Sequence, residues 1–242
     1  MKHKWCVAFD FDGTLLDPSF ISILRIVKEQ IGLSPAGIAV IDGLLKRFLD
    51  RAIRGVTTKE EETEWLLSEM DVFLKHGLSP LAVAPLVARL RFRQGALECL
   101  DWLKAHGVPV AVVSFSVRPF IRMVLAAHDA LDLVDEVCAL KLVIDPKTTL
   151  YRCCDDTTLV IPTNKGYWAG RFAAEHGVDP SRILGVGDSL ADRLLGITPE
   201  NRFGFASDEE YRRRMRQYFG EVVITRDFYP AFEWIRNKLA SG

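Results

Sequence analysis

Residues 7–15 read Val7-Ala8-Phe9-Asp10-Phe11-Asp12-Gly13-Thr14-Leu15, and this stretch decides the fold of the chain. It begins as an apolar run bounded by a turn signal, which is typical of a buried β-strand. Side chains two positions apart on an extended segment point to the same face, so Asp10 and Asp12 can act together. Gly13 permits a tight turn directly beside them. Because ligands bind at the carboxyl ends of strands in open α/β sheets, we expect a functional site here.

The composition is that of a soluble globular protein. The chain has 242 residues, a formal net charge of −1 and a hydrophobic content of 49%. The near-neutral charge argues against nucleic acid as a partner. No run approaches the roughly 18 apolar residues of a membrane span, so no membrane association is expected. The few residues before the first apolar run leave no room for a signal peptide, and a cytoplasmic location is therefore expected.

The sequence after the first strand has helical periodicity and no strand pattern. Apolar residues recur at helical spacing from residue 18 to residue 89. Thr58 followed by Glu61 has the form of a capping box, which predicts that a helix begins there. This segment is far longer than an ordinary connection in an α/β unit. We therefore predict an α/β core domain formed by residues 1–17 and 90–242, and a small all-helical domain formed by residues 18–89.

The rest of the chain alternates predicted strands with predicted helices. This order calls for a mostly parallel sheet with helices on both faces. One apolar strand ends at Ser114, and a later one ends at Gly187-Asp188. Lys165 opens a predicted helix between them. Each of these polar groups is therefore expected at the edge of the sheet that carries Asp10.

The sequence also predicts a β-hairpin between the strand that ends at Ser114 and Lys165. Residues 136–144 and 157–161 both read as strands, and Asp145-Pro146-Lys147 between them is a turn signal. We expect these segments to pair as a small β excursion.

Four features, in this order, resemble the signatures of the haloacid dehalogenase (HAD) superfamily. They are Asp10-Phe11-Asp12-Gly13-Thr14, the strand ending in Ser114, Lys165, and Gly187-Asp188-Ser189 followed by Asp192. The resemblance implies a Rossmann-like core with a helical cap inserted after the first signature. A calcium loop also begins Asp-x-Asp, but its glycine and its closing glutamate would fall at Leu15 and Ile21, so we set that alternative aside.

The resemblance implies phosphoryl chemistry. Asp10 would attack phosphorus and form an aspartyl-phosphate. Asp12 would protonate the leaving group and then take a proton from the attacking water. Dehalogenases of the superfamily lack the second aspartate, so its presence selects phosphoryl transfer over dehalogenation.

The resemblance also implies a metal ion and a phosphate site. Mg²⁺ would be held by the Asp10 carboxylate, the Asp12 backbone carbonyl and Asp188. Asp192 would orient Lys165 or a water bound to the metal. The oxygens of the transferred phosphoryl group would be held by Ser114, the backbone amide of Phe115, and Lys165.

Each of these residues also has a structural interpretation. Asp12 could form a turn with Gly13, and Asp188 could cap the following helix. Lys165 could lie on the surface, and Ser114 could be an ordinary loop serine. These interpretations would have to hold together at one edge of one sheet, which favours the functional hypothesis.

The leaving group would be contacted by the insertion. Arg54, Glu61, Glu64 and Trp65 are candidates for that contact. A structural interpretation is favoured for them, because acidic residues in a first helical turn suit the helix dipole and a tryptophan suits the core.

The resemblance is to the group that includes phosphoserine phosphatase and the pyrimidine 5′-nucleotidases. Ser19-Phe20-Ile21 stands where phosphoserine phosphatases have a glutamate, and Phe115-Ser116 stands where the nucleotidases have Ala-Gly. The sequence therefore leaves the substrate open.

The expected function is that of a Mg²⁺-dependent phosphomonoesterase acting on a small phosphorylated metabolite. A phosphotransferase or mutase using the same intermediate is an alternative, and a non-catalytic binding protein with this fold is another. The four intact residues Asp10, Asp12, Lys165 and Asp188 speak against the binding protein. No sequence feature fixes the oligomeric state.

Overall fold

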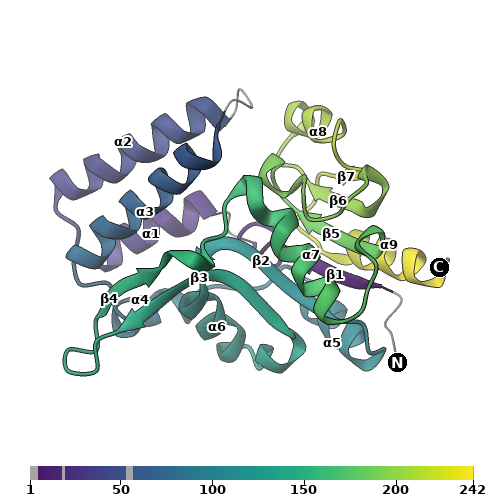
Figure 1. Ribbon diagram of the computed structural model, residues 1–242, viewed down its shortest axis with the longest axis horizontal. Coiled ribbons are helices and arrows are strands. Elements are labelled where there is room, and N and C mark those ends of the chain that lie inside the picture. Colours follow the sequence, from purple (N-terminus) through teal and green to yellow (C-terminus); the bar gives the residue numbers. More distant parts are fainter. Residues whose placement is uncertain (1–4, 18–19, 53–56, 242) are drawn as a thin grey trace.

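The sheet at the centre of the molecule has seven strands in the order β4-β3-β2-β1-β5-β6-β7 (Figure 1). The computed structural model describes residues 5–17, 20–52 and 57–241. Neighbouring strands are parallel except β3 and β4, which are antiparallel. The mostly parallel α/β architecture predicted from the sequence is thus confirmed. The strands are β1 (Cys6–Phe9), β2 (Val110–Val117), β3 (Glu136–Ile144), β4 (Tyr151–Asp155), β5 (Ile183–Gly187), β6 (Arg202–Phe205) and β7 (Glu221–Val223).

Helices cover both faces of the sheet, and β1 shows why. Val7 and Phe9 pack into the apolar cluster that includes residues of α5, α6 and α9. Cys6 and Ala8 point to the other face, where α7 packs. A strand whose side chains are buried on both faces reads as a continuous apolar run. The helices of the core are α5 (Ala96–Ala105), α6 (Arg118–Ala127), α7 (Lys165–Glu175), α8 (Glu209–Met215) and α9 (Tyr229–Ala240).

A helical insertion lies between β1 and β2 and gathers at one side of the sheet (Figure 1). The predicted capping box is present at the start of its third helix. The Glu61 backbone amide donates to Thr58 Oγ1 at 3.3 Å, and the Thr58 amide donates to Glu61 Oε2 at 3.0 Å. The helices are α1 (Phe20–Gln30), α2 (Pro35–Ala52), α3 (Lys59–Lys75) and α4 (Pro80–Val87).

The two connections between the insertion and the sheet run side by side. The Asp17 amide donates to the Arg91 carbonyl at 3.3 Å, and the Arg93 amide donates to the Leu15 carbonyl at 2.8 Å. Leu16 and Phe92 form an antiparallel bridge between these bonds. The chain therefore leaves the core and returns to it at neighbouring points.

The predicted hairpin exists, but its second strand is not where the sequence placed it. β4 spans Tyr151–Asp155, and residues 156–158 form a 3₁₀ turn instead of the strand predicted for residues 157–161. The Thr158 hydroxyl donates to the Asp155 carbonyl at 2.7 Å and accepts from the Lys141 amide at 2.9 Å. Threonine hydroxyls that bond to nearby backbone compete with strand pairing, which explains the error.

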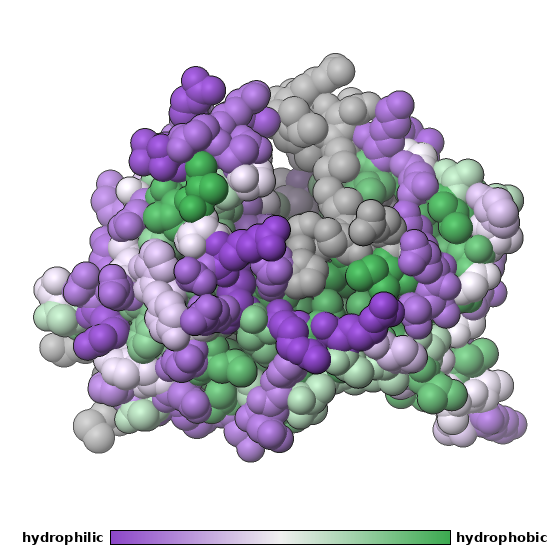
Figure 2. All heavy atoms as spheres, turned by 180° about the vertical axis from the view of Figure 1, so that it is seen from behind, coloured by the Kyte–Doolittle hydropathy of each residue, from purple (hydrophilic) through white to green (hydrophobic). Residues whose placement is uncertain are grey.

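The surface is mixed in character. Figure 2 shows a face on which hydrophilic side chains predominate and apolar ones form small groups between them. Among the helices that the structure describes, none combines the length and the apolar character required to cross a membrane.

Candidate active site

The candidate active site lies at the carboxyl ends of the central strands. In the parallel register, Phe9 pairs with Val112 of β2 and with Val186 of β5. The Asp10 amide continues this pattern and donates to the Val186 carbonyl at 2.9 Å. Since Ser114 and Asp188 each follow their strand's paired residue by two positions, the topology brings both to the edge that carries Asp10.

The loop after β1 is folded tightly around Asp10. The amides of Leu15 and Leu16 both donate to the Phe11 carbonyl at 3.0 Å. The Thr14 hydroxyl lies 3.4 Å from Asp10 Oδ2. Gly13 has a φ of +86°, and a Cβ at this position would lie 2.0 Å from Oδ2 of Asp188. Glycine is required here both by the left-handed backbone and by the close approach of Asp188.

Lys165 is the first residue of α7, and its side chain is fully buried. Its ammonium group donates to Asp10 Oδ1 at 2.7 Å and to Asp192 Oδ1 at 2.5 Å. It also lies 4.9 Å from the centre of the Phe115 ring. Burial alone would lower the pKa of Lys165, but the charges of Asp10 and Asp192 outweigh it and hold the pKa above its ordinary value. Lys165 is therefore a protonated cation inside the site, and the surface interpretation is wrong.

Asp192 connects Lys165 to the turn that carries Asp188. While Oδ1 accepts from Lys165, Oδ2 accepts from the amides of Asp188 and Ser189 at 3.1 and 2.9 Å and from the Ser189 hydroxyl at 2.9 Å. Gly187 makes room for it, because a Cβ there would lie 2.2 Å from Cβ of Asp192. Both oxygens of Asp192 are thus engaged in positioning its neighbours.

Three carboxylates form a cluster that fits a divalent cation. Asp10, Asp188 and Asp192 each place one oxygen so that the three lie within 4.8 Å of one another. Burial, followed by the charges of Asp10 and Asp192, raises the pKa of Asp188 well above its ordinary value. Carboxylate oxygens are the ligands that Mg²⁺ prefers, and a cation would relieve this concentration of negative charge. The Oδ2 atom of Asp192 already accepts three hydrogen bonds, whereas Oδ2 of Asp10 has only a long contact with the Thr14 hydroxyl, so Asp10 and Asp188 are the better candidates for direct coordination.

Asp12 is buried, and neither of its side-chain oxygens makes a hydrogen bond of normal geometry to a described residue. Burial and the negative charge of Asp10 raise the pKa of Asp12 to about 8, against the smaller opposing effect of the Ser116 hydroxyl. Burial also raises the pKa of Asp10, to about 6, and the charge of Lys165 opposes the increase. The pKa of Asp12 thus lies above that of Asp10, so the two carboxyl groups differ in chemical character.

Ser114 is buried near the end of β2. Its hydroxyl oxygen accepts a hydrogen bond from the Ser116 amide at 3.2 Å. The next residue, Phe115, is half-buried and presents its ring to Lys165. The structure thus brings Ser114, Phe115 and Lys165 to the same edge as Asp10.

Two of the four residues of the insertion that the sequence suggested as substrate contacts, Glu61 and Trp65, make structural contacts within the insertion. Glu61 closes the capping box, and Glu64 is exposed on α3. Trp65 is buried and stacks on Phe48 with ring centres 3.8 Å apart. Arg54 lies outside the described residues.

Two residues near the site were not singled out from the sequence. Glu62 is fully buried in α3 and accepts hydrogen bonds from Thr163, two residues before Lys165. Arg93 donates to the carbonyl oxygen of Gly13. The partners of Glu62 and Arg93 are distant in the chain, so no local pattern indicated them.

The comparison with protein families decides the assignment. The model of the haloacid dehalogenase-like hydrolases matches residues 7–196, which is most of the chain. The chain belongs to this family. The matched region contains Asp10, Ser114, Lys165 and Asp188.

Individual relatives are more distant. A phosphoserine phosphatase of Archaeoglobus fulgidus is 25% identical over 194 residues, which are 80% of this chain and 50% of that protein. The chain thus spans about half the length of this curated relative. A substrate-bound phosphoserine phosphatase structure aligns over 97% of this chain and 99% of that chain, with 18% identity and a TM-score of 0.70. The structure of cytosolic 5′-nucleotidase IIIB bound to cytidine aligns over 98% and 87%, with 16% identity and a TM-score of 0.73. At these identities, the two structures establish a shared fold.

Proposed function

We propose that this chain is a Mg²⁺-dependent phosphomonoesterase that hydrolyses a small phosphorylated metabolite through an aspartyl-phosphate on Asp10. The observation that carries the proposal is the placement of Asp10, which accepts a hydrogen bond from the buried Lys165, beside Asp12, a buried carboxyl group whose side-chain oxygens have no hydrogen-bond partner among the described residues. The charge of Lys165 favours an ionised Asp10, whereas burial and the charge of Asp10 raise the pKa of Asp12, so the two groups suit the roles of nucleophile and proton donor. The family membership and the phosphoserine phosphatase relative support the same chemistry.

In the first step, a carboxylate oxygen of Asp10 attacks phosphorus, and Asp12 gives its proton to the departing alkoxide. Lys165 and the hydroxyl of Ser114 hold phosphoryl oxygens as negative charge spreads over them. In the second step, Asp12, now ionised, takes a proton from the water that hydrolyses the aspartyl-phosphate. Asp192 keeps Lys165 directed at Asp10 throughout.

The residues that would hold Mg²⁺ are Asp10 and Asp188, with the backbone carbonyl of Asp12 as a further oxygen ligand. When bound, the ion neutralises charge between the carboxylates and the phosphoryl group. Asp192 would orient the surroundings of the ion through the turn at residues 188–189.

We further propose that residues 18–89 act as a cap domain over a core formed by residues 1–17 and 90–242. The paired connections at residues 15–17 and 91–93 support this division. A cap at this position would contact the leaving group and exclude water from the site. The relatives suggest amino-acid phosphates and nucleoside monophosphates as the first substrates to test.

The test is phosphate release from a panel of phosphorylated amino acids, nucleotides and sugars, with Mg²⁺ and with EDTA. We expect metal-dependent release that Asp10→Asn abolishes. Metal-independent release, or an Asp10→Asn variant with wild-type activity, would refute the mechanism. Product that appears on an added acceptor alcohol instead of as free phosphate would identify a phosphotransferase.

A further inference from the structure

One buried carboxylate of the helical insertion is bound to the core. Glu62 of α3 is fully buried, and its Oε2 accepts from the amide and the hydroxyl of Thr163 at 3.0 and 2.6 Å. Its Oε1 accepts from the Thr57 hydroxyl at 2.9 Å. A buried carboxylate is costly unless donors surround it, and two of the three donors come from a single core residue. The burial of Glu62 therefore depends on the contact between the insertion and Thr163.

The turn that contains Thr163 leads directly to Lys165. Residues 162–164 form a 3₁₀ turn, and α7 begins at Lys165. The Asn164 side chain fixes this turn from within, since its Oδ1 accepts from the Ile161 amide at 2.8 Å and its Nδ2 donates to the Leu159 carbonyl at 2.9 Å. Thr163 is held from outside, by Glu62. Because this turn fixes the position of the first residue of α7, it also fixes the direction in which the Lys165 side chain extends into the site.

A second contact of α3 reaches the same lysine from another side. Trp65 lies one helical turn after Glu62, and its ring meets the Phe115 ring edge-on at 6.3 Å. The Phe115 ring in turn lies 4.9 Å from the Lys165 ammonium group. The insertion thus touches both the backbone that precedes Lys165 and the ring that packs against it.

We propose that Glu62 is a positioning residue that couples docking of the helical insertion on the core to the placement of Lys165 against Asp10. The inference rests on the function proposed above, in which Lys165 stabilises the transferring phosphoryl group. When the insertion is docked, both donors of Thr163 are satisfied by one carboxylate and the start of α7 is fixed. When the contact is broken, the turn loses its outer support and Lys165 loses its exact direction. Interactions that matter most in the transition state affect kcat more than KM.

The central experiment compares Thr163→Val with Thr163→Ser. Valine preserves the shape of threonine and removes the hydroxyl donor, whereas serine keeps the donor. With p-nitrophenyl phosphate as substrate, we expect Thr163→Val to lower kcat about tenfold with KM within about twofold of wild type. Thr163→Ser should restore kcat to within about twofold of wild type. This small substrate has a leaving group unrelated to any natural one, so a loss of specific cap recognition would not produce the effect.

Glu62→Gln provides an independent variant, and Asp71→Asn is its matched control. Both substitutions replace a carboxylate of α3 by its amide, but Asp71 is exposed and forms an ion pair with Lys75. We expect Glu62→Gln to lower kcat about as much as Thr163→Val, because the charge-assisted hydrogen bonds become weaker neutral ones. Asp71→Asn should leave kcat unchanged.

Hydrogen exchange of the peptide that spans residues 160–168 gives a readout that requires no substrate. We expect faster exchange at the Thr163 amide in Thr163→Val and Glu62→Gln than in the wild type and in Thr163→Ser. If Glu62→Gln and Thr163→Val both retain wild-type kcat, or if they only raise KM, the proposal is wrong. Equal losses in the valine and serine variants would also overturn it. A wild-type protein without phosphatase activity would refute the proposed function instead, and unchanged exchange in the variants would then refute the coupling as well.

Discussion

The guanidinium group of Arg93 donates two hydrogen bonds to the carbonyl oxygen of Gly13, from Nε at 3.0 Å and from Nη2 at 2.6 Å. A third hydrogen bond runs from Nη1 to the Thr225 carbonyl at 2.7 Å, and the group lies 4.5 Å from the centre of the Phe205 ring. Arg93 follows the insertion in the chain, yet it holds the loop that carries Asp10. The planar, forked guanidinium suits this task because several donors act from one rigid group.

Arg93→Lys is expected to lower kcat/KM about tenfold, because lysine cannot reproduce the forked contact with Gly13. Steady-state kinetics on the best substrate of the panel would measure this. Arg91→Lys is the control, since Arg91 is exposed and its guanidinium group donates to the nearby carbonyls of Ala88 and Leu90. Equal activity in the two variants would show that Arg93 does not support the loop.

Gly13→Ala should abolish activity in a protein that still folds, because the new methyl group would collide with the Asp188 carboxylate. Gly32→Ala is the matched control. Gly32 has a φ of +66°, and apart from its chain neighbours no atom of a described residue lies within 4 Å of the position its Cβ would take. It therefore carries the same type of backbone strain, about 1 kcal/mol, without the collision. The prediction fails if both variants lose stability alike and keep their activity.

Asp12→Asn should affect substrates according to their leaving groups. We expect a loss of at least about a hundredfold in kcat with alkyl phosphates, whose alkoxide needs a proton as it departs. The formation of the aspartyl-phosphate from p-nitrophenyl phosphate should be affected much less, because nitrophenolate leaves without protonation. Rapid-quench measurement of the phosphorylated enzyme distinguishes this step from hydrolysis. If Asp12→Asn lowers the rate of aspartyl-phosphate formation equally for alkyl phosphates and for p-nitrophenyl phosphate, Asp12 is not the general acid.

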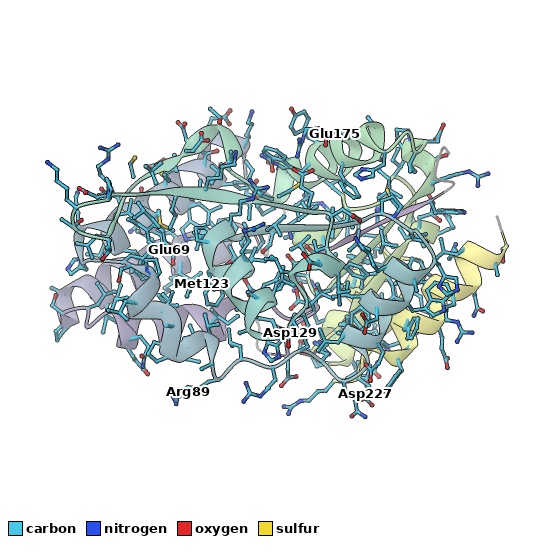
Figure 3. All side chains as sticks on the ribbon, turned by 90° about the horizontal axis from the view of Figure 1, so that it is seen from below. Glu69, Arg89, Met123, Asp129, Glu175 and Asp227 are labelled. Atoms are coloured by element: carbon cyan, nitrogen blue, oxygen red, sulfur yellow. The ribbon has the colours of Figure 1, made fainter. Side chains whose placement is uncertain are left out.

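Glu69 should make stability depend on pH. It lies buried among the helices of the insertion (Figure 3), and its Oε1 has no hydrogen-bond partner among the described residues. Burial raises the pKa of Glu69 to about 8, although the charge of Lys28 opposes this. The folded protein then holds a proton that the unfolded chain has released, so this contribution to stability is complete at acidic pH. It is lost as the pH rises from the ordinary glutamate pKa through about 8.

Glu69→Gln is therefore expected to be more stable than wild type at pH 9, by on the order of 3 kcal/mol, and equally stable at pH 4. Denaturant unfolding at both pH values measures the difference. Glu64→Gln, an exposed change on the same helix, should show no such dependence. A constant difference between Glu69→Gln and wild type at all pH values would contradict the prediction.

The sequence predicted which residues meet at one edge of the sheet wherever the order of strands and helices determines their position. Asp10, Asp12 and Asp188 follow apolar strands, and Lys165 begins a helix, so the α/β topology alone brings them to one edge. Glu62 was not predicted, because its neighbour Glu61 satisfied the capping pattern and its own partner is 101 residues away.

Other errors and omissions have the same physical origin. Arg93 was missed because its partner, Gly13, lies 80 residues earlier in the chain. The strand predicted for residues 157–161 was wrong because side-chain hydroxyls bonded to the backbone there. Local patterns predict which residues are extended or helical, whereas burial of a polar group depends on donors that only the tertiary fold supplies.

Because Asp17 and Arg91 are hydrogen-bonded neighbours, the segment between them could be removed or replaced at these two positions. The intervening residues begin and end at almost the same point in space, so a tight turn would suffice to join the flanking segments. Such a shortened chain would retain every strand of the sheet and the carboxylates at its edge. The segment could in this sense be exchanged for another insertion at the same two positions, provided that the replacement offers Thr163 an acceptor in place of Glu62.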